Sequence, residues 1–470
     1  MLEQLRSAGR INLADDAFGW STVDTATSDS MERVINDALS RAGVLFETRS
    51  LSLMHLPFLF GANLKSNLEA KFARLHKVIE RIPALYLASA PVRAFFRLPP
   101  MMDEFVRINC NVDPNVFLCR YDFSLTQSGS PRIYELNAAA PAALSFSPYF
   151  FQALTATNLF AQIKSQVPFT MEPFLAQREQ LLMRGIKEFL SAKCGIAQPT
   201  LGIVNSRINT MVNELGVMER EASEMGLNVV RSFVEDLHLE GINLLANGKK
   251  LDAVFAKIDI TPGSDFECPI TRCQADIEAL LGGIRAGIPY INPFCSSFLI
   301  DNKSTLAFLQ SELANPILDQ SERALIEEIV PLTKILHQLS SRELNHISAN
   351  KDQWVLKKSL DTRGRSVVIG RAISSLEWSH ALEGARRDGS DNYVVQQFEP
   401  PEYCISGGQP LFTSHAYFLL KGQPCGAFTR TSKTLVTNVG SGGSVQVPLL
   451  AHVFDQKEIK STQSQINEQT

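Results

Sequence analysis

The first hundred residues carry apolar side chains at three- and four-residue spacing. This pattern covers 31–46 and 67–96, and it predicts amphipathic helices that bury one face. Prolines divide the second stretch into shorter helices, because a proline cannot continue through a helix interior. We therefore expect a helical N-terminal region over 1–110, and nothing in its pattern indicates chemistry.

The pattern then changes to strands. Two stretches rich in apolar residues, 115–125 and 130–139, flank a turn-forming cluster at 127–131 and predict a β-hairpin. A further helical stretch ends near Cys194. From 200 to 294, short apolar runs alternate with helices that end at glycines, which indicates a small parallel sheet of Rossmann type. No GxGxxG motif follows its first strand, so dinucleotide binding is not indicated.

The remainder of the chain mixes helices and strands. The pattern predicts helices over 304–313 and 321–339, and strands over 353–360, 366–373, 392–400 and 415–432. The polar tail over 456–470 lacks aromatic residues and predicts disorder. The fold class that follows is α/β (α+β).

Composition and charge disfavour several classes of function. The chain has 45 Lys+Arg against 49 Asp+Glu, a formal net charge of -4, so its charge gives no reason to expect nucleic acid or an anionic membrane as a partner. The eight cysteines show no zinc-finger spacing and there is no HExxH motif. The N-terminus lacks the apolar core of a secretory signal, and no apolar run is long enough to span a bilayer. We expect a cytoplasmic protein.

The predicted hairpin carries the first candidate chemistry. Residues two apart share one face of a strand, so Arg120 and Asp122 project together, as do Glu135 and Asn137. Carboxylate and amide oxygens suit Mg²⁺, and a neighbouring arginine can bind a phosphoryl group. The opposite face is expected to be apolar and buried, with Tyr134 among its members. The alternative is a strand whose polar face meets only water.

Lysines form the second candidate. Lys303 begins a helix after a strand, and Lys357 and Lys358 lie on a strand that runs into the polar turn 361–365. A strand lysine followed by such a turn suits a flap over a triphosphate, where the lysine neutralises phosphate oxygens. An ordinary surface hairpin is the alternative.

A glycine-rich loop forms the third candidate. Gly440, Gly442 and Gly443 follow closely after Arg430 and could bring backbone N–H groups close to an anion. It is not a Walker A loop, because GxxxxGK[ST] occurs nowhere in the chain. A flexible loop without a ligand is the alternative.

The order of these motifs resembles the circularly permuted ATP-grasp ligases, a group that includes the synthetase domain of glutathionylspermidine and trypanothione synthases. The matching stretches cover most of 116–448: RYD followed by YELNAAAP, then YINPFCSSFLIDNKSTLAFL, WVLKKS, YVVQQFEPP and AFTRTSK with TNVGSGGS. In ordinary ATP-grasp enzymes the E-x-N motif follows the two nucleotide lysines. Here Glu135-Leu136-Asn137 precedes both, as in the permuted group.

The resemblance implies a role for each motif. Two Mg²⁺ ions on the phosphates of ATP would be held by Asp122, Glu135 and Asn137. The transferred phosphoryl group would be met by Arg120, by Arg430 and by the loop with Gly442 and Gly443. The α- and β-phosphates would be held by Lys303 and by Lys357 or Lys358. The hinge along the adenine would be Gln396, Gln397, Phe398 and Glu399.

The sequence also departs from the family in four respects. Lys358 replaces the proline that usually follows the strand lysine, so either lysine could be the phosphate ligand. The flap has fewer glycines than many relatives, and no amidase domain precedes the region of resemblance. Lys257, in the substrate domain, stands where the family often has an arginine.

The resemblance implies a domain organisation. The expected parts are a helical N-terminal region (1–110), the first part of the ATP-grasp core (111–195), a Rossmann-like pre-ATP-grasp substrate domain (196–300), the lid with the remaining core (301–455) and the tail (456–470). Substrate specificity would lie in the N-terminal helices, the Rossmann-like part and loops such as 261–273.

The implied activity is that of an ADP-forming carboxylate–amine ligase that works through an acyl phosphate. Its partners would be a small-molecule or peptide carboxylate and an amine. One alternative is a ligase of the same fold that takes its amine from aminoacyl-tRNA, which the net charge of -4 disfavours without excluding it. Another is an inactive protein that binds a nucleotide or a partner. The sequence identifies neither the two substrates nor the oligomeric state.

Overall fold

The structure is a computed structural model. It describes residues 1–21, 25–46, 49–110, 113–175, 181–196, 198–207, 213–258, 275–361, 366–388 and 393–453. The specificity loop 261–273 and the tail 456–470 therefore lie outside the described residues, as does most of the flap at 361–365.

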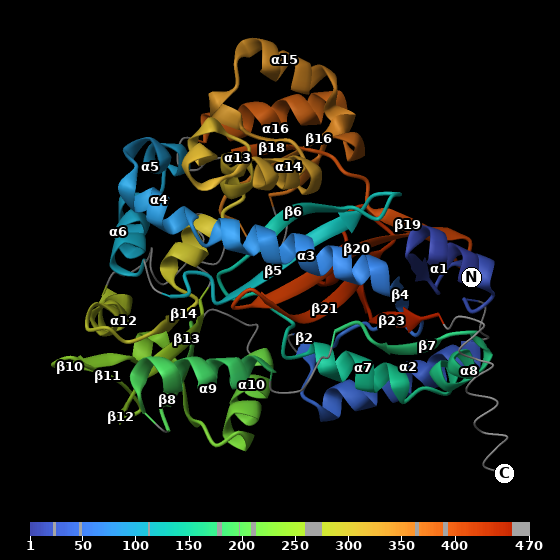
Figure 1. Cartoon of the computed structure of the whole chain (residues 1–470), viewed down its shortest axis with the longest axis horizontal. Coiled ribbons are helices and arrows are strands. Elements are labelled where there is room, and N and C mark those ends of the chain that lie inside the picture. Colours follow the sequence, from blue (N-terminus) through green and yellow to red (C-terminus); the bar gives the residue numbers. More distant parts are fainter. Residues whose placement is uncertain are drawn as a thin grey trace.

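A six-stranded antiparallel sheet forms the centre of the molecule (Figure 1). Its strands in spatial order are β22 (Ser444–Gln446), β21 (Gln423–Ser432), β20 (Gln409–Leu420), β5 (Leu118–Leu125) and β6 (Pro131–Asn137), with β19 (Glu402–Ser406) also paired to β20. The predicted hairpin of β5 and β6 is confirmed. The stretch predicted as strand over 415–432 is also a hairpin, because Lys421 and Gly422 both take positive φ at its turn.

One face of this sheet is sealed by α3 (Ala62–Ile79), which crosses it in Figure 1. Phe72 of α3 packs its ring within 5.4 Å of the rings of Tyr121, Phe123 and Tyr417. These side chains alternate along the strands with the polar ones, so burying them turns Arg120 and Asp122 to the other face.

A second, all-parallel sheet lies beside the central one. It has the order β14 (Tyr290–Ile291), β13 (Ala253–Lys257), β8 (Thr200–Asn205) and β9 (Asn228–Phe233). The helices α9 (Leu181–Cys194), α10 (Asn213–Glu224) and α12 (Ala275–Arg285) belong to this region, together with the small antiparallel sheet of β10 (His238–Glu240), β11 (Asn243–Ala246) and β12 (Lys249–Lys250). The predicted parallel sheet is confirmed, while the domain limits around it stay a prediction.

A third sheet stands above the central one as a lid (Figure 1, top). Its strands are β15 (Thr333–Ile335), β18 (Tyr393–Gln397), β16 (Trp354–Lys358) and β17 (Val368–Ile369), and α15 (Ser341–Ala349) and α16 (Ser375–Arg387) cover it. The helix predicted over 321–339 was wrong in its second half. The helix α14 (Gln320–Ile329) ends before Pro331, because proline excludes the helical conformation from the residue before it, and the chain then pairs as β15.

The N-terminal region is not wholly helical, which corrects the prediction for 1–110. The predicted helices are present as α2 (Thr25–Arg41) and, over 67–96, as α3, α4 (Ile82–Ala88) and α5 (Ala90–Phe96). A further helix, α6 (Pro100–Ile108), follows them, and α4, α5 and α6 each carry proline in their first positions. Two strands, β1 (Arg10–Asn12) and β4 (Phe58–Gly61), join β23 (Pro448–His452) and β7 (Thr170–Pro173) in a fourth sheet. These partners are distant in sequence, and so the local pattern did not reveal them.

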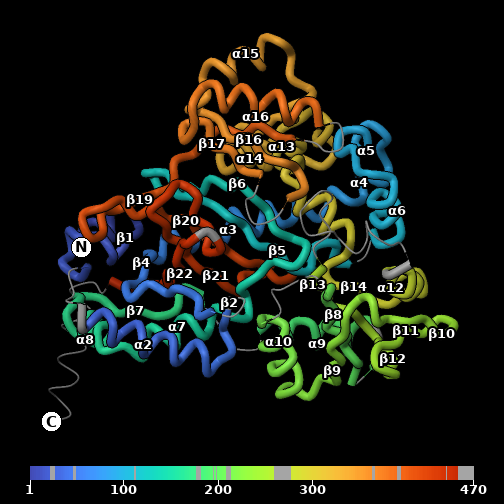
Figure 2. The backbone as a smooth tube through the Cα atoms, turned by 180° about the vertical axis from the view of Figure 1, so that it is seen from behind, coloured from blue at the N-terminus to red at the C-terminus, as the bar shows by residue number. Residues whose placement is uncertain are grey.

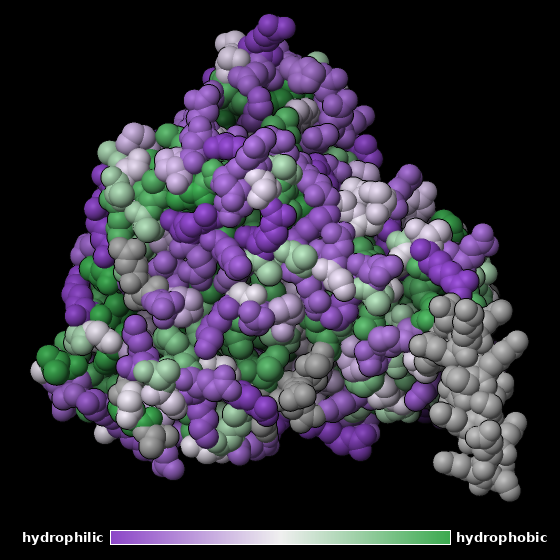
Figure 3. All heavy atoms as spheres, in the orientation of Figure 1, coloured by the Kyte–Doolittle hydropathy of each residue, from purple (hydrophilic) through white to green (hydrophobic). Residues whose placement is uncertain are grey.

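The face in Figure 3 is covered mainly by hydrophilic residues, with apolar residues in small groups between them. Within the described part of the chain, no helix has the length and apolar character needed to cross a membrane.

Candidate functional site

A cavity of about 650 Å³ opens on the face of the central sheet that α3 leaves uncovered. Its walls come from the central sheet, the lid, the parallel sheet and the N-terminal layer. Those parts surround the sheet when the molecule is seen from behind (Figure 2). Most of the residues singled out in the sequence line it: Arg120, Glu135, Asn137, Lys257, Lys303, Lys357, Gln396, Gln397, Phe398, Glu399 and Arg430. The volume lies within the usual range for small-ligand pockets.

A buried carboxylate holds two arginines at the floor of this cavity. Arg120 donates from Nε and Nη2 to the two oxygens of Asp122, at 2.8 and 3.0 Å, and Arg430 Nη2 lies 3.0 Å from Asp122 Oδ2. The Asp122 side chain is 0% exposed. Burial raises the pKa of Asp122, but the two guanidinium groups outweigh this and hold that pKa below its usual value. Asp122 is therefore an anion that fixes two cations in place.

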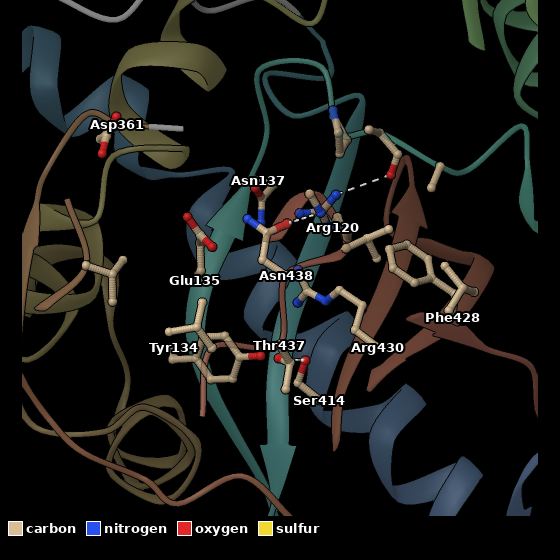
Figure 4. Close-up of a pocket in the computed structure, with 18 of the residues that line it drawn as sticks. Arg120, Tyr134, Glu135, Asn137, Asp361, Ser414, Phe428, Arg430, Thr437 and Asn438 are labelled. Carbon is tan, nitrogen blue, oxygen red and sulfur yellow. Dashed lines mark hydrogen bonds between the residues drawn. The ribbon is translucent and has the colours of Figure 1, made fainter. Parts of the chain in front are cut away.

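Asn137 completes this cluster. Its Nδ2 donates to Asp122 Oδ2 at 3.2 Å, and its amide oxygen remains as an acceptor. In Figure 4, Glu135 and Asn137 lie on β6, Arg120 on β5 and Arg430 on β21, around one space. The register explains this grouping, because Arg120 is paired with Asn137 and Asp122 with Glu135.

A β-bulge alters the face that Tyr134 presents. The register shifts between Asp122 and Phe123, so Tyr134 is the extra residue of β6. Its ring lines the cavity, which corrects the prediction of a buried apolar position. Lys357 Nζ lies 5.4 Å from the centre of this ring and makes a cation–π contact with it.

Two lysines reach the cavity from the lid side. Lys303, directly before α13 (Ser304–Leu309), lies 2.9 Å from Glu135 Oε1 and donates to the carbonyl of Asp361 at 2.9 Å. Lys357, on β16, donates to the carbonyl of Tyr134 at 3.1 Å and to Gln396 Oε1 at 2.6 Å. Burial lowers the pKa of Lys357 to about 8, and the cation of Lys303 adds to this effect while Glu135 opposes it.

Lys358 does not reach the cavity wall. It follows Lys357 on the same strand and so points to the opposite face, where its Nζ lies 3.7 Å from Asp388 Oδ2. The choice that the sequence left open between the two lysines is thus decided geometrically in favour of Lys357 as the cavity residue.

The predicted hinge runs along the lid side of the cavity. The backbone N–H groups of Gln397 and Phe398 donate to the carbonyls of Leu332 and Gln353, both at 2.7 Å. The side chain of Gln396 is buried between Lys357 and Thr333. The Phe398 ring carries the guanidinium of Arg371 at 4.4 Å.

Glu399 ends this hinge and ties the lid to the central sheet. Its Oε1 accepts from Arg132 of β6, Nε at 3.0 Å and Nη2 at 2.8 Å. The lid and the sheet that carries the arginines are thus joined by an ion pair next to the cavity.

The glycine loop contributes different residues from those predicted. Residues 435–440 line the cavity, whereas Gly442 and Gly443 do not. Gly442 takes φ +90°, and a Cβ on Gly443 would come within 2.8 Å of the Asn438 carbonyl oxygen. These two glycines shape the turn behind the cavity wall, and the residues before them face the cavity.

Three residues of the site were missed in the sequence. Asp301 accepts from the N–H groups of Ala138 and Ala139 at 2.6 and 2.9 Å, and burial raises the pKa of its carboxyl to about 6 despite Lys303 nearby. Glu214 binds Lys257 at 2.7 Å and accepts from the N–H of Ala143 at 2.8 Å. Tyr134 is the third. Of these three residues, only Asp301 could have been suspected from the sequence, because it lies two residues before the candidate Lys303.

The predicted Mg²⁺ ligands differ in whether they line the cavity. Among the described residues no three His, Cys, Asp or Glu side chains gather as a metal site. Glu135 and Asn137 line the cavity and supply hard oxygen ligands, which suits a cation that takes one or two carboxylates plus phosphate oxygens. Asp122 is not among the cavity-lining residues and accepts hydrogen bonds from Arg120, Arg430 and Asn137, so its predicted part in holding Mg²⁺ stays a prediction.

Comparison with known proteins shows similarity in structure. No family model and no curated protein sequence matches the chain. A glutathione synthetase-like effector from Globodera pallida shares the fold, with a TM-score of 0.59 and 11% identity over 92% of this chain and 98% of that one. A Methylobacillus flagellatus KT protein assigned as a gamma-glutamylcysteine synthetase gives a TM-score of 0.44 and 11% identity over 84% of this chain and 90% of that one.

The first of these likenesses carries the argument, and it concerns the fold alone. The chain is a mixed α/β protein with several sheets, and it shares its fold with the glutathione synthetase-like effector. The predicted α/β fold class is confirmed, while the ATP-grasp family and its circular permutation stay predictions.

Proposed function

We propose that the protein is an ADP-forming carboxylate–amine ligase of the circularly permuted ATP-grasp type. The observation that carries this proposal is the meeting of two buried lysines, two arginines and the Glu135–Asn137 pair in one cavity. A polyanion that must be held, neutralised and attacked at one phosphorus requires such a set. A protein that only binds a partner has no chemical need for it.

Chain order supports the permuted arrangement. Glu135 and Asn137 lie on β6, while Lys303 and Lys357 come more than 150 residues later in the chain, yet all four line the same cavity. The E-x-N motif thus meets the lysines in space although it precedes them in sequence.

The nucleotide would lie under the lid. The adenine would follow the backbone of 396–399, where Phe398 and Ile369 offer apolar surface. The phosphates would meet Lys303 and Lys357. Lys357 is suited to this role because its present hydrogen bonds go to two uncharged oxygens, and a phosphate would relieve the desolvation of its ammonium group.

Glu135 and Asn137 would hold Mg²⁺ beside these phosphates, with Lys303 released from Glu135 toward a phosphate oxygen. The ion would supply neutralisation of the phosphate charge. Asp122 would act through the arginines, as the residue that positions them.

The arginines would hold the reacting carboxylate and the phosphoryl group. A carboxylate oxygen attacks the γ-phosphorus, the bond to the bridging oxygen breaks, and ADP leaves. The amine nitrogen then attacks the carbonyl carbon of the acyl phosphate, phosphate leaves, and the nitrogen loses a proton. Arg120 and Arg430 would stabilise the charge on the transferred group, already aligned by Asp122.

Calorimetric titration with ATP, with and without Mg²⁺, tests the proposal. We expect magnesium-dependent binding that weakens ~10-fold or more in Glu135→Gln, because a metal ligand is lost. Glu172→Gln is the matched control, since Glu172 lies on β7 with a half-exposed side chain paired to His452. A folded wild type that binds no ATP contradicts the nucleotide site. Binding without release of phosphate in the presence of acids and amines contradicts the ligase activity.

A further inference from the structure

The cavity has apolar lining residues that the proposed nucleotide site leaves unused. Four of them are buried members of one core and Val439 packs against that core; the five are Leu51, Phe146, Phe150, Val439 and Val445. We call these five the apolar lobe. They come from the N-terminal layer, the start of α7 (Ser147–Thr155), the turn η8 (Val439–Ser441) and β22.

The apolar lobe adjoins the arginines directly. Val445 is the cross-strand partner of Arg430, so the two side chains project from the same face of the central sheet. Phe428 precedes Arg430 by two residues on that face, and its ring centre lies 5.9 Å from the Arg120 guanidinium and 6.0 Å from that of Arg430. A group held by the two arginines therefore has apolar surface immediately beside it.

The lobe is preformed. Val445 donates its N–H to the carbonyl of Ser52 at 2.8 Å and accepts from Met54 N–H at 2.7 Å, which fixes β22 against the segment that carries Leu51. The rings of Phe146 and Phe150 lie 6.4 Å apart on successive turns. Val445 and Phe150 are each 2% exposed. A site with little freedom to reorganise selects its ligand by shape and polarity.

Polar and charged residues also line this cavity, among them Arg49, Asn213, Glu214 and Lys257. Lys257 and Glu214 form an ion pair at 2.7 Å there, and Glu214 also holds the N–H of Ala143, a residue with φ +80°. This pair is an anchor for the loop 138–143 and links the lobe to the parallel sheet.

We infer that the carboxylate substrate carries an apolar group, of branched aliphatic or aromatic type, next to its carboxylate. The carboxylate would lie on Arg120 and Arg430, and its substituent would fill the apolar lobe. Against these five side chains a polar substituent would lose its water without gaining a hydrogen-bond partner from them, which is costly. This inference rests on the proposed function for the role of the arginines, and it adds the class of acid.

Binding separates the inference from the ligase activity. Calorimetry in the presence of Mg²⁺ and a non-hydrolysable ATP analogue would compare leucine with asparagine, which have similar size, and phenylalanine with glutamine. We expect the apolar acid of each pair to bind at least ~10-fold more tightly. Equal binding, or tighter binding of the polar acids, overturns the apolar lobe as a specificity site and leaves the ligase proposal standing.

Turnover is followed in parallel with hydroxylamine as the amine, because it traps an acyl phosphate as a hydroxamate. Hydroxamate from the apolar acids supports both proposals. Its absence, with ATP bound and the apolar preference in binding intact, contradicts the ligase activity while supporting the lobe.

Substitutions in the apolar lobe test whether its side chains cause the preference for apolar acids. Val445→Thr keeps the shape and adds a hydroxyl, and we expect it to reduce the leucine-to-asparagine ratio by ~3-fold or more. Phe146→Ala opens space, and we expect it to favour phenylalanine over leucine relative to the wild type. Leu376→Ala is the control, since Leu376 lies on α16 and is 67% exposed. Ratios unchanged in both lobe variants, with melting temperatures near that of the wild type, would contradict the assignment.

Discussion

The two groups of cations in the cavity differ in how their charge is balanced. Arg120 and Arg430 share the carboxylate of Asp122, which is fully buried and ionised. Lys357 instead donates to the carbonyl of Tyr134 and the amide oxygen of Gln396, and burial lowers its pKa to about 8. The arginines form a clamp that Asp122 already holds together. Lys357 is not within ion-pair distance of a carboxylate among the described residues, so an anion bound beside it would offset its desolvation.

This difference teaches that a cavity can hold positive charge in two ways. A buried ion pair fixes the orientation of its side chains, and removing one partner leaves the other charge buried and unpaired. A desolvated lysine contributes affinity, because part of its desolvation cost is recovered on binding. Substitution in the Asp122–arginine cluster should therefore lower the stability of the protein, whereas substitution of Lys357 should lower its affinity for an anionic ligand.

The largest effect is expected at Asp122. Asp122→Asn removes the anion between two buried arginines and turns an amide N–H toward them, so we expect the free energy of unfolding to fall by about 3–5 kcal/mol. Chemical denaturation measures this. The matched control is Asp37→Asn, because Asp37 is 65% exposed and pairs with Arg41 within one helix, where a change of about 0.5 kcal/mol or less is expected. Equal losses in both variants would contradict the buried clamp.

The next effect is expected at Lys357. Lys357→Met keeps the length of the side chain and removes its charge, so we expect ATP affinity to fall ~10- to 100-fold, the usual worth of a charge-assisted hydrogen bond. Stability should not fall by more than about 1 kcal/mol, because the lost hydrogen bonds are offset by relief of the desolvated charge. Lys358→Met is the matched control on the same strand, and an equal loss of affinity there would reverse the assignment of the two lysines.

The third effect concerns pH. The folded-state pKa of Lys357, about 8, lies below that of an unfolded lysine, so the unfolded chain binds more protons between pH 8 and 10.5. Its contribution to stability therefore rises with pH across this window, by up to about 3 kcal/mol. ATP binding should show the opposite trend and weaken above pH 8, since the cation must form to meet the phosphates. Comparing wild type with Lys357→Met isolates both trends, and parallel profiles would contradict them.

The smallest effect is expected at Tyr134, which lies between the two groups. Tyr134→Phe keeps the ring below Lys357, so ATP affinity should stay within ~2-fold of the wild type. Tyr134→Leu removes the cation–π contact and should weaken ATP binding by a further ~3-fold. Titration calorimetry of both variants measures the difference, and an equal effect of the two would assign it to the hydroxyl instead.

Local pattern predicted a large part of the fold. The spacing of apolar residues located the β5–β6 hairpin, the helices of the N-terminal region and the parallel sheet. Strand alternation also placed Arg120, Asp122, Glu135 and Asn137 on related faces, because the period of two is a property of the strand itself. The same alternation separated Lys357 from Lys358 without indicating which one faced a ligand.

Other features depended on pairing between distant segments. The bulge that turns Tyr134 into the cavity arises from the register between β5 and β6, and the strand β4 exists because β1 and β23 pair with it. Asp301 belongs to the site because a loop more than 160 residues earlier donates to it. None of these partners is near in sequence.

The sequence by itself determined which chemical groups were available and, away from the bulge at Tyr134, which side chains share a strand face. Only the tertiary structure decided which neighbours each group has. Asp122 is paired with Arg120 on its own strand and with Arg430, which approaches from β21. Lys357 acquired its lowered pKa because the lid and central sheet together exclude water from it. Charge pairing and desolvation depend on what surrounds a group in space, and a local pattern carries no record of that.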